Sequence, residues 1–200
     1  MLKGEKLEDP MGFTEYLRKG VEMAKLRGEA AEEVAADENA FIPAMVMFAL
    51  PMLLVEAGVL VFFSMGRMVL PFPGMTSKAL AFLCAFNFLL VLMPFAGVGI
   101  LHLVAKAFKG EGGYYGYYQA MGVGSIVGWG GIIPYIGIIF SIWSVVVNVV
   151  ITKHVQKLTT GKAAAVVLMP VLVGFILGIF IAVFVGMGMF MGLIGRGMLH

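Results

Sequence analysis

The residue with the clearest potential for chemistry is Glu56, an acid that stands alone in a long apolar stretch. An ionisable side chain inside such a segment is costly to keep and commonly serves a function. At ~1.5 Å per helical residue, Glu56 lies ~22 Å from Phe41, at a depth similar to that of Asn87 on the next apolar segment. We therefore expect a protonated Glu56 that hydrogen-bonds to Asn87 or to the serines Ser141 and Ser144, because the charged form is unfavourable away from water.

Small and polar residues form a second pattern later in the chain. They recur at steps of three or four residues, the spacing of neighbours on one helix face: Gly137, Ser141, Ser144, Asn148 and Thr152. The predicted polar cluster combines both patterns and consists of Glu56, Asn87, Ser141, Ser144 and Asn148. Two interpretations fit it: a structural clasp between helices, and a pathway for ions, protons or lipid headgroups.

Glycines provide a third pattern. Small residues on one helix face let two backbones approach closely in lipid. The predicted packing positions are Gly124, Gly128, Gly131, Gly137, Gly174 and Gly178. A compact helix bundle with no further role is the alternative interpretation of this pattern.

The remaining reactive residues are too scattered for a recognisable catalytic or metal site. Cys84 is the only cysteine, which excludes an intrachain disulfide and a cysteine-based zinc site. His102, His154 and His200 lie on separate segments, without a carboxylate or second histidine three or four residues away. We therefore predict no metal, no cofactor and no enzymatic activity.

These residues belong to a chain that is almost uninterrupted hydrocarbon from Phe41 to Leu199. Hydrophobic residues make up 60% of the sequence, charged residues 13%, and the mean hydropathy is +0.97. An average soluble domain does not have this composition. A helix of about 20 apolar residues spans ~30 Å of hydrocarbon, so the sequence predicts an all-α polytopic membrane protein.

Charged and turn-forming clusters divide the apolar stretch into five predicted transmembrane helices in a compact bundle. They lie at about 41–66, 79–105, 117–133, 135–152 and 163–188. One helix over the third and fourth of these would be ~50 Å long, so we place a turn at Pro134, which disfavours helix. The alternative is a re-entrant hairpin that returns without crossing, which we count as a four-span protein.

The first 40 residues differ from the rest, with ten acidic and six basic side chains. Apolar residues recur there at helical spacing at Phe13, Leu17, Val21 and Ala24, with Gly20 on the same side. This predicts a short amphipathic helix at the cytoplasmic membrane surface, and leaves open a charged arm or a partner-binding helix. We divide the chain into an N-terminal arm, 1–40, and a five-span domain, 41–200.

Orientation follows from lysine and arginine. Five spans with a cytoplasmic N-terminus place eleven of these residues inside and three outside. Because cytoplasmic loops carry an excess of positive charge, this orientation is preferred over the four-span alternative. We expect a prokaryotic plasma membrane protein with its C-terminus outside.

Four short segments in the second half of the chain have a distinctive sequence. They begin at Tyr114, Ile132, Ile142 and Val155 and read YYGYYQA, IIPYIGI, IWSVVV and VQKLTTGKAAAVVLMP. They resemble the Yip domain family, the Ypt/Rab-interacting membrane proteins, and in particular its prokaryotic members. The resemblance is strongest over 112–170 and looser over 41–108, and it implies five spans, a cytoplasmic N-terminus and no catalytic residues.

The predicted function is that of a non-enzymatic membrane organiser or trafficking-type scaffold that acts through helix packing and self-association. Eukaryotic members of the family act in vesicle trafficking with small GTPases, whereas the minimal arm of this chain argues against GTPase binding. The expected partners are the lipid bilayer, further copies of the chain or other membrane proteins, and a lipid ligand, but no nucleic acid. The alternative is a small transporter, channel or lipid scramblase that uses Glu56 and the polar face of the fourth span.

Overall fold

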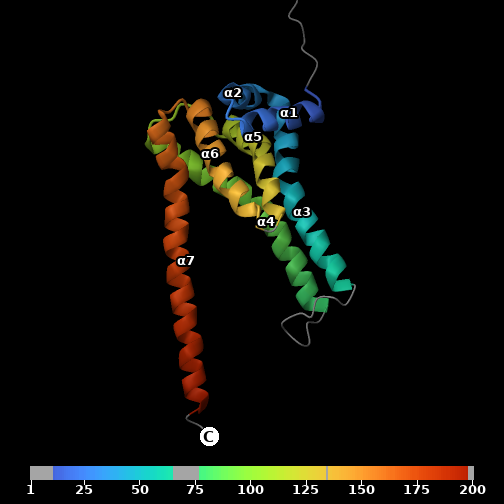
Figure 1. Cartoon of the computed structure of the whole chain (residues 1–200), viewed down its shortest axis with the longest axis vertical. Coiled ribbons are helices and arrows are strands. Elements are labelled where there is room, and N and C mark those ends of the chain that lie inside the picture. Colours follow the sequence, from blue (N-terminus) through green and yellow to red (C-terminus); the bar gives the residue numbers. More distant parts are fainter. Residues whose placement is uncertain (1–10, 65–76, 134, 198–200) are drawn as a thin grey trace, which may run out of the picture.

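The computed structural model describes residues 11–64, 77–133 and 135–197, except for some side chains of the three longest helices. Every regular element within these ranges is helical, which confirms the all-α class (Figure 1). In chain order the elements are α1 Phe13–Ala24, α2 Gly28–Ala36, η1 Glu38–Ala40, α3 Phe41–Ser64, α4 Ser77–Ala107, α5 Tyr114–Gly124, η2 Ser125–Ile132, α6 Gly137–Val155 and α7 Thr160–Gly197.

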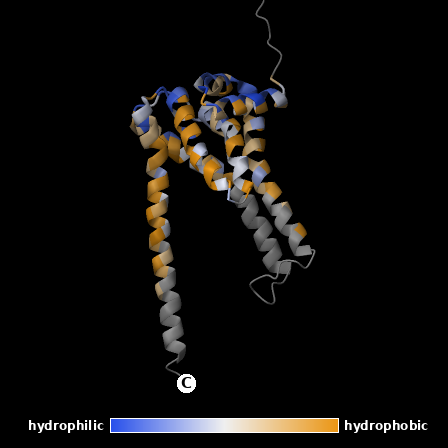
Figure 2. Ribbon diagram, in the orientation of Figure 1, coloured by the Kyte–Doolittle hydropathy of each residue, from blue (hydrophilic) through white to orange (hydrophobic). Residues whose placement is uncertain are grey.

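The helices fall into two groups of different length and polarity. Figure 1 shows α3, α4 and α7 as long legs, with α1 and α2 at the top beside α5 and the upper end of α3, while η2 and α6 turn back partway down. The hydrophilic residues gather in the upper part, and the described parts of the legs are hydrophobic (Figure 2). This separation is typical of a membrane protein with a polar cap, which we define as α1 and α2.

The corner between α2 and α3 is fastened by Asp37. Its carboxylate caps η1 by accepting from the Asn39 N–H at 2.9 Å, and also accepts from the Tyr16 hydroxyl at 2.5 Å. Its carbonyl accepts from the buried Gln119 amide at 2.9 Å. Burial and the Asp37 carboxylate raise the pKa of Tyr16, so this hydroxyl stays a donor. The chain can therefore bend by 93° between α2 and the start of α3.

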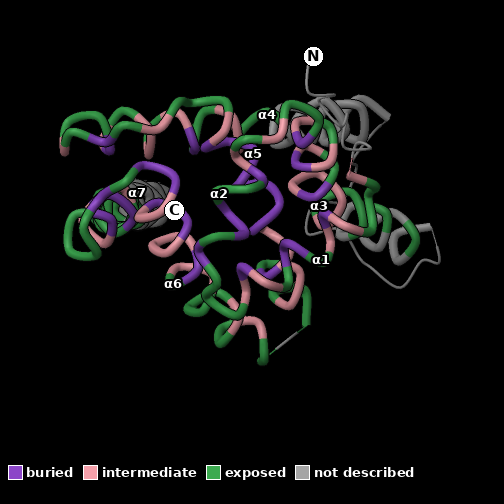
Figure 3. The backbone as a smooth tube through the Cα atoms, turned by 90° about the horizontal axis from the view of Figure 1, so that it is seen from above, coloured by how far each residue is buried: buried purple, intermediate pink, exposed green. Residues whose placement is uncertain are grey.

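The core lies where the cap meets α3, α5 and α6, as the buried residues at the centre of Figure 3 show. Eight consecutive residues of α5, 117–124, are buried. The Tyr118 ring stacks on Phe95 of α4 with a centroid separation of 4.5 Å, and Phe41 stacks on Tyr115. Residues on both sides of position 40 share this core, while the domain boundary predicted there stays a prediction.

The predicted N-terminal helix is present as α1, but its buried face is rotated from the expected one. Phe13 and Val21 are 44% and 43% exposed, whereas Tyr16 and Met23 are buried. Gly20 is at the closest point of the buried face, because a methyl group there would lie 2.8 Å from the Val123 carbonyl oxygen. This close approach turns the glycine side of α1 toward α5.

Lys19 is also on the buried face of α1, and it is only 8% exposed. Its ammonium pairs with Glu33 of α2 and, at 3.7 Å, with Glu22. A buried ammonium is tolerated when carboxylates compensate for its lost hydration. This charged contact holds α1 and α2 together as one cap.

Two described helices are long and apolar enough to cross a membrane: α6, and residues Thr160–Phe184 of α7. A third is added if α2 and α3 are taken as one bent span. The described residues thus give two or three candidate spans, and the five predicted spans are not confirmed. The third predicted span is an 11-residue α-helix followed by a 3-10 helix, and Pro134 itself lies outside the described residues.

Close helix contacts occur at two of the six predicted packing glycines. A methyl group at Gly124 would overlap the Ile151 side chain, and one at Gly137 would lie 2.7 Å from the Gly131 carbonyl oxygen. A methyl group at the other four would meet no atom of the described structure within 4 Å: Gly128, Gly131, Gly174 and Gly178. Sequence spacing alone did not separate glycines that face a neighbouring backbone of the same chain from glycines that face outward, and helix packing at these four stays a prediction.

Gly122 is a closer contact that the sequence did not single out. A Cβ atom there would lie 2.5 Å from the Ala44 Cβ and 2.8 Å from its carbonyl oxygen. We expect Gly122→Ala to push α5 from α3 and destabilise the protein by about 1–3 kcal/mol, as overpacking does. Gly128→Ala is the matched control, because the space beside Gly128 is open.

The measurement is thermal unfolding of both variants in detergent, followed by size-exclusion chromatography. Gly122→Ala should melt several degrees below the control. Equal melting temperatures would show that α3 and α5 are not in close contact at this point.

Candidate functional site

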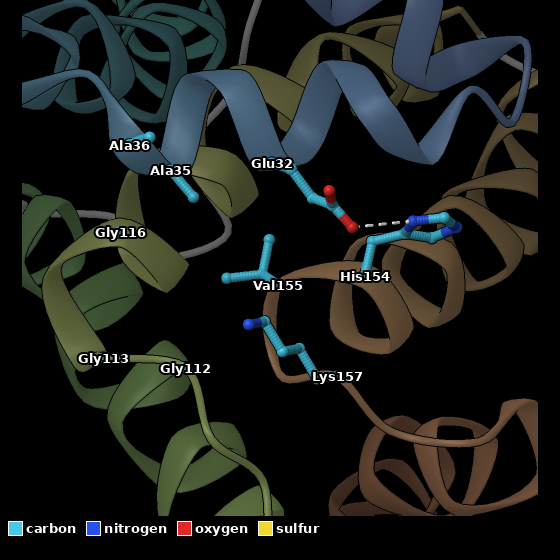
Figure 4. Close-up of a pocket in the computed structure, with 9 residues that line it drawn as sticks. All are labelled: Glu32, Ala35, Ala36, Gly112, Gly113, Gly116, His154, Val155 and Lys157. Carbon is cyan, nitrogen blue, oxygen red and sulfur yellow. Dashed lines mark hydrogen bonds and ion pairs between the residues drawn. The ribbon is translucent and has the colours of Figure 1, made fainter.

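A cavity of about 340 Å³ opens between the cap and the adjoining ends of α5 and α6. Three elements line it, and Figure 4 shows their side chains around the opening. The lining residues are Glu32, Ala35 and Ala36 of α2, Gly112, Gly113 and Gly116 at the start of α5, and His154, Val155 and Lys157 at the end of α6. The size suits a small polar group rather than a large substrate.

One wall of the cavity is the pair formed by Glu32 and His154. The imidazole Nδ1 lies 3.1 Å from the carboxylate Oε1, as the dashed line in Figure 4 marks. The same ring packs against Gly28, where any side chain would overlap it. Gly28 and Glu32 are one turn apart on α2, so a single helix face holds His154 on two sides.

The floor of the cavity is built from glycine backbone. A methyl group at Gly112 would overlap the Val155 carbonyl, and one at Gly116 would overlap the Ala35 carbonyl. The start of α5 can therefore approach both α6 and α2 without side chains between them. Gly113 has open space beside it and caps α5 without a side-chain hydrogen bond, which leaves amides of the first turn available to a ligand.

Lys157 forms the rim, at a position that requires an unusual backbone. Its φ of 53° lies in the left-handed region, which ends α6 and redirects the chain. The Glu111 amide donates to the Gln156 carbonyl at 3.0 Å and joins this turn to the loop before α5. The two loops therefore hold the lysine beside the cavity opening.

Below the floor, buried polar side chains connect α5 to α6. The Thr152 hydroxyl donates to the Asn148 carbonyl at 2.7 Å, so the Tyr117 hydroxyl is the donor in its own 2.7 Å bond to Thr152. Gln156 pairs with His102 of α4 at 3.1 Å. These bonds fix the relative positions of three helices under the cavity.

The lining presents a carboxylate, an imidazole, an ammonium and backbone amides. Lys157 and the first turn of α5 favour an anionic group such as a phosphate or carboxylate. Glu32 opposes an anion unless His154 or the ligand compensates its charge. Among the described residues, no three of the histidine, cysteine or acidic side chains gather as metal ligands would. The geometry therefore favours binding or docking.

The predicted polar cluster lies elsewhere. The side chains of Glu56 and Asn87 are outside the described residues, so their pairing stays a prediction. Ser141 is exposed and donates to the Gly137 carbonyl of its own helix at 2.9 Å, while Ser144 and Asn148 are half-buried. The structure brings none of these three to the cavity.

Sequence reasoning missed the residues that do form the cavity. Glu32 is one of ten acids among the first 40 residues, and His154 is one of three histidines on separate segments, so neither residue stands out in the sequence. Their pairing joins positions 122 residues apart, which no local spacing reveals. The one available signal was the Gly112 and Gly113 pair directly before a helix, a pattern that permits close backbone approach.

Comparison with known families identifies the family of this chain. The Yip1 domain model matches residues 26–183, which is most of the 200-residue chain. The match begins just before α2 and ends within α7, so it includes every residue that lines the cavity. No curated protein and no solved structure matches the chain.

The Glu32 and His154 pair should contribute to docking of the cap. Both side chains are partly exposed, so we expect Glu32→Gln to cost about 0.2–1 kcal/mol and to speed hydrogen exchange in α2. Glu29→Gln is the control, because Glu29 is exposed on the same helix and outside the cavity lining. Identical exchange in the two variants would remove the pair from the docking interface.

Proposed function

Because the chain belongs to the Yip1 domain family, we propose that this integral membrane protein is a non-enzymatic membrane organiser that acts through helix packing and self-association. The observation that supports the proposal is the isolation of α7. Its first turns pack through Ala163 and Val166 against α4 and α6, but every residue from 171 to 180 is exposed. A helix of this kind offers an apolar surface to lipid and to other membrane helices.

Two glycines give the exposed part of α7 a surface suited to a second helix. Gly174 and Gly178 are four residues apart on one face, with open space beside both. In lipid, such small faces allow close backbone contact and interhelical packing, which drive association where the hydrophobic effect gives little. We propose that α7 of a second copy packs on this face.

The matched variants are Gly174→Leu with Gly178→Leu, and Ile176→Leu with Phe180→Leu on the opposite face. The first pair should weaken self-association about tenfold, which corresponds to about 1.4 kcal/mol, whereas the second pair should leave it unchanged. The measurement is energy transfer between labelled copies in liposomes over a range of protein-to-lipid ratios. The proposal would be contradicted if the two double variants associated equally strongly, or if the unmodified protein did not associate.

The transport alternative depends on Glu56, and it is tested in the same liposomes with ions, small solutes and fluorescent lipids. A flux that Glu56→Gln abolishes without loss of stability would replace the organiser role. The scaffold predicts no such flux.

We propose that the cap faces the cytoplasm of a prokaryotic cell and that the end of α7 lies across the plasma membrane. The excess of lysine and arginine on the proposed inner side supports this orientation. Five spans place the two ends of the chain on opposite sides of the membrane. The re-entrant alternative does the same, because a hairpin that does not cross leaves three spans rather than the four counted from the sequence.

Reporter fusions test the orientation. A reporter that works only in the cytoplasm should be active when it is fused at Met1. A reporter that works only outside the cell should be active when it is fused after His200. Both ends on one side would contradict every odd number of spans. The fusions do not distinguish five spans from three, which requires a measurement of depth.

A further inference from the structure

The two halves of the segment from α5 to α6 have opposite surroundings. In the upper half, polar and apolar side chains alike are buried under the cap, among them Tyr117, Gln119, Ile151 and Thr152. In the lower half, large aliphatic side chains point outward: Ile132, Ile133, Ile136, Ile138, Ile139 and Ile142. Tyr135 beside the turn is 95% exposed. We call residues 132–133 and 135–142 the tip.

The cap sets the highest level that hydrocarbon can reach on this segment. The Trp143 indole N–H donates to the Ala24 carbonyl at the end of α1, at 2.9 Å. Lys25 follows directly and is exposed, and the exposed Arg18 lies two turns back on α1. Charged side chains are expensive in hydrocarbon, so the bilayer surface lies no higher than Trp143, a residue type enriched at membrane interfaces.

The position of α3 sets the lowest level that the tip can reach. The Trp129 indole of η2 donates to the Met47 carbonyl of α3 at 3.1 Å. From Met47, α3 runs on to Ser64 for ~26 Å, whereas η2 ends three residues after Trp129, or ~6 Å at 2.0 Å per residue.

A tip at the far surface would place the remaining turns of α3, including the exposed Leu53 and Leu54, in water. The tip therefore ends inside the bilayer. Figure 1 shows the same relation, with α3 and α7 extending well below the turn.

We infer that the segment from α5 to α6 is a re-entrant wedge whose apolar tip inserts into the cytoplasmic leaflet only. From Trp143 to Gly137 the chain descends ~9 Å, and half of a ~30 Å hydrocarbon core is ~15 Å, so the tip stops short of the midplane. Helix α6 is long enough to cross, but its upper half packs inside the protein. The partner of the tip is the acyl-chain region of one leaflet, and α3, α4 and α7 are the spans.

Insertion into a single leaflet expands that leaflet and favours bending of the membrane toward the cytoplasm. This consequence rests on the proposed organiser function. The depth of the wedge does not, because it follows from the contacts of Trp129 and Trp143.

Depth is measured on the full chain with Cys84 replaced by Ala and one new cysteine, reconstituted in liposomes of phosphatidylcholine and phosphatidylglycerol. The tip variant is Tyr135→Cys, with Ile139→Cys as a second tip position if the first does not fold. Lys157→Cys is the aqueous reference on the cytoplasmic side. A spin label at each site reports depth through its accessibility to oxygen and to a water-soluble nickel complex.

The wedge predicts that the tip cysteines react with a membrane-impermeant maleimide at least tenfold more slowly than Lys157→Cys from either side. It also predicts a label depth within the cytoplasmic leaflet. Fast reaction of the tip from the outside would establish five spans. Reaction from the cytoplasmic side as fast as that of Lys157→Cys would show that the tip stays out of the bilayer.

Membrane bending is tested separately with Ile138→Ser and Ile139→Ser, by electron microscopy of the liposomes. If the tip is at the inferred depth and the unmodified protein bends no membrane, the bending consequence fails and the wedge stands, while self-association is decided by its own energy-transfer experiment. If bending is lost with the two serines and kept with the α7 glycine variants, the tip is its source.

Discussion

The rest of the structure depends on the requirement that the charges of α1 stay out of hydrocarbon. Lys19 is satisfied inside the protein by Glu33 and Glu22, but Arg18 and Lys25 remain at the surface. Helix α1 packs along the side of α5 and α6. If the charges of α1 stay in water, the upper half of α5 and α6 must therefore lie outside the hydrocarbon as well. The position of a short polar helix therefore decides how much of a longer apolar segment can meet lipid.

That packing is possible because glycine has no side chain, so a neighbouring backbone or ring can approach its Cα closely. Gly20 admits α1 to the Val123 carbonyl, Gly28 admits the His154 ring, and Gly116 admits the Ala35 carbonyl. With the helices this close, a buried polar group can find a partner, as the Tyr117 hydroxyl does at Thr152. Buried polar groups are stable only under this condition, so the glycines and the hydrogen-bonded core depend on each other.

The sequence predicts properties that composition and local spacing carry. The helical class, the break near Pro134 and a helix around Phe13 to Ala24 all follow from apolar runs and turn residues. The number of spans does not, because hydropathy counts residues and contains no information on depth: 117–152 is apolar enough to cross twice, and the bond between Tyr117 and Thr152 fits a hairpin of either depth. The face of α1 that is buried depends on the fit of Gly20 to α5, a tertiary contact.

The candidate site divides in the same way. Gly112 and Gly113 are visible in the sequence as a loop, but Glu32 and His154 become a pair only when α2 folds over α6. Glu56 and Asn87 attract attention because polar residues are rare in apolar runs, whereas Glu32 is one acid among many. Local rarity is thus a poor guide to a cavity that the fold assembles from common residue types.

The short wedge and the isolated α7 have one geometric cause. Val149 of α6 packs near Ala163 and Val166 of α7. Below this level α6 extends only a few turns, to its first residue Gly137, whereas α7 continues to Gly197. A segment that crossed the whole bilayer would cover α7 along its length. Because the wedge stops in one leaflet, the described contacts of α7 lie near its start, and every residue from 171 to 180 is exposed. The surface proposed for self-association is therefore a consequence of the depth at which the hairpin turns, which in turn follows from where the charges of α1 meet water.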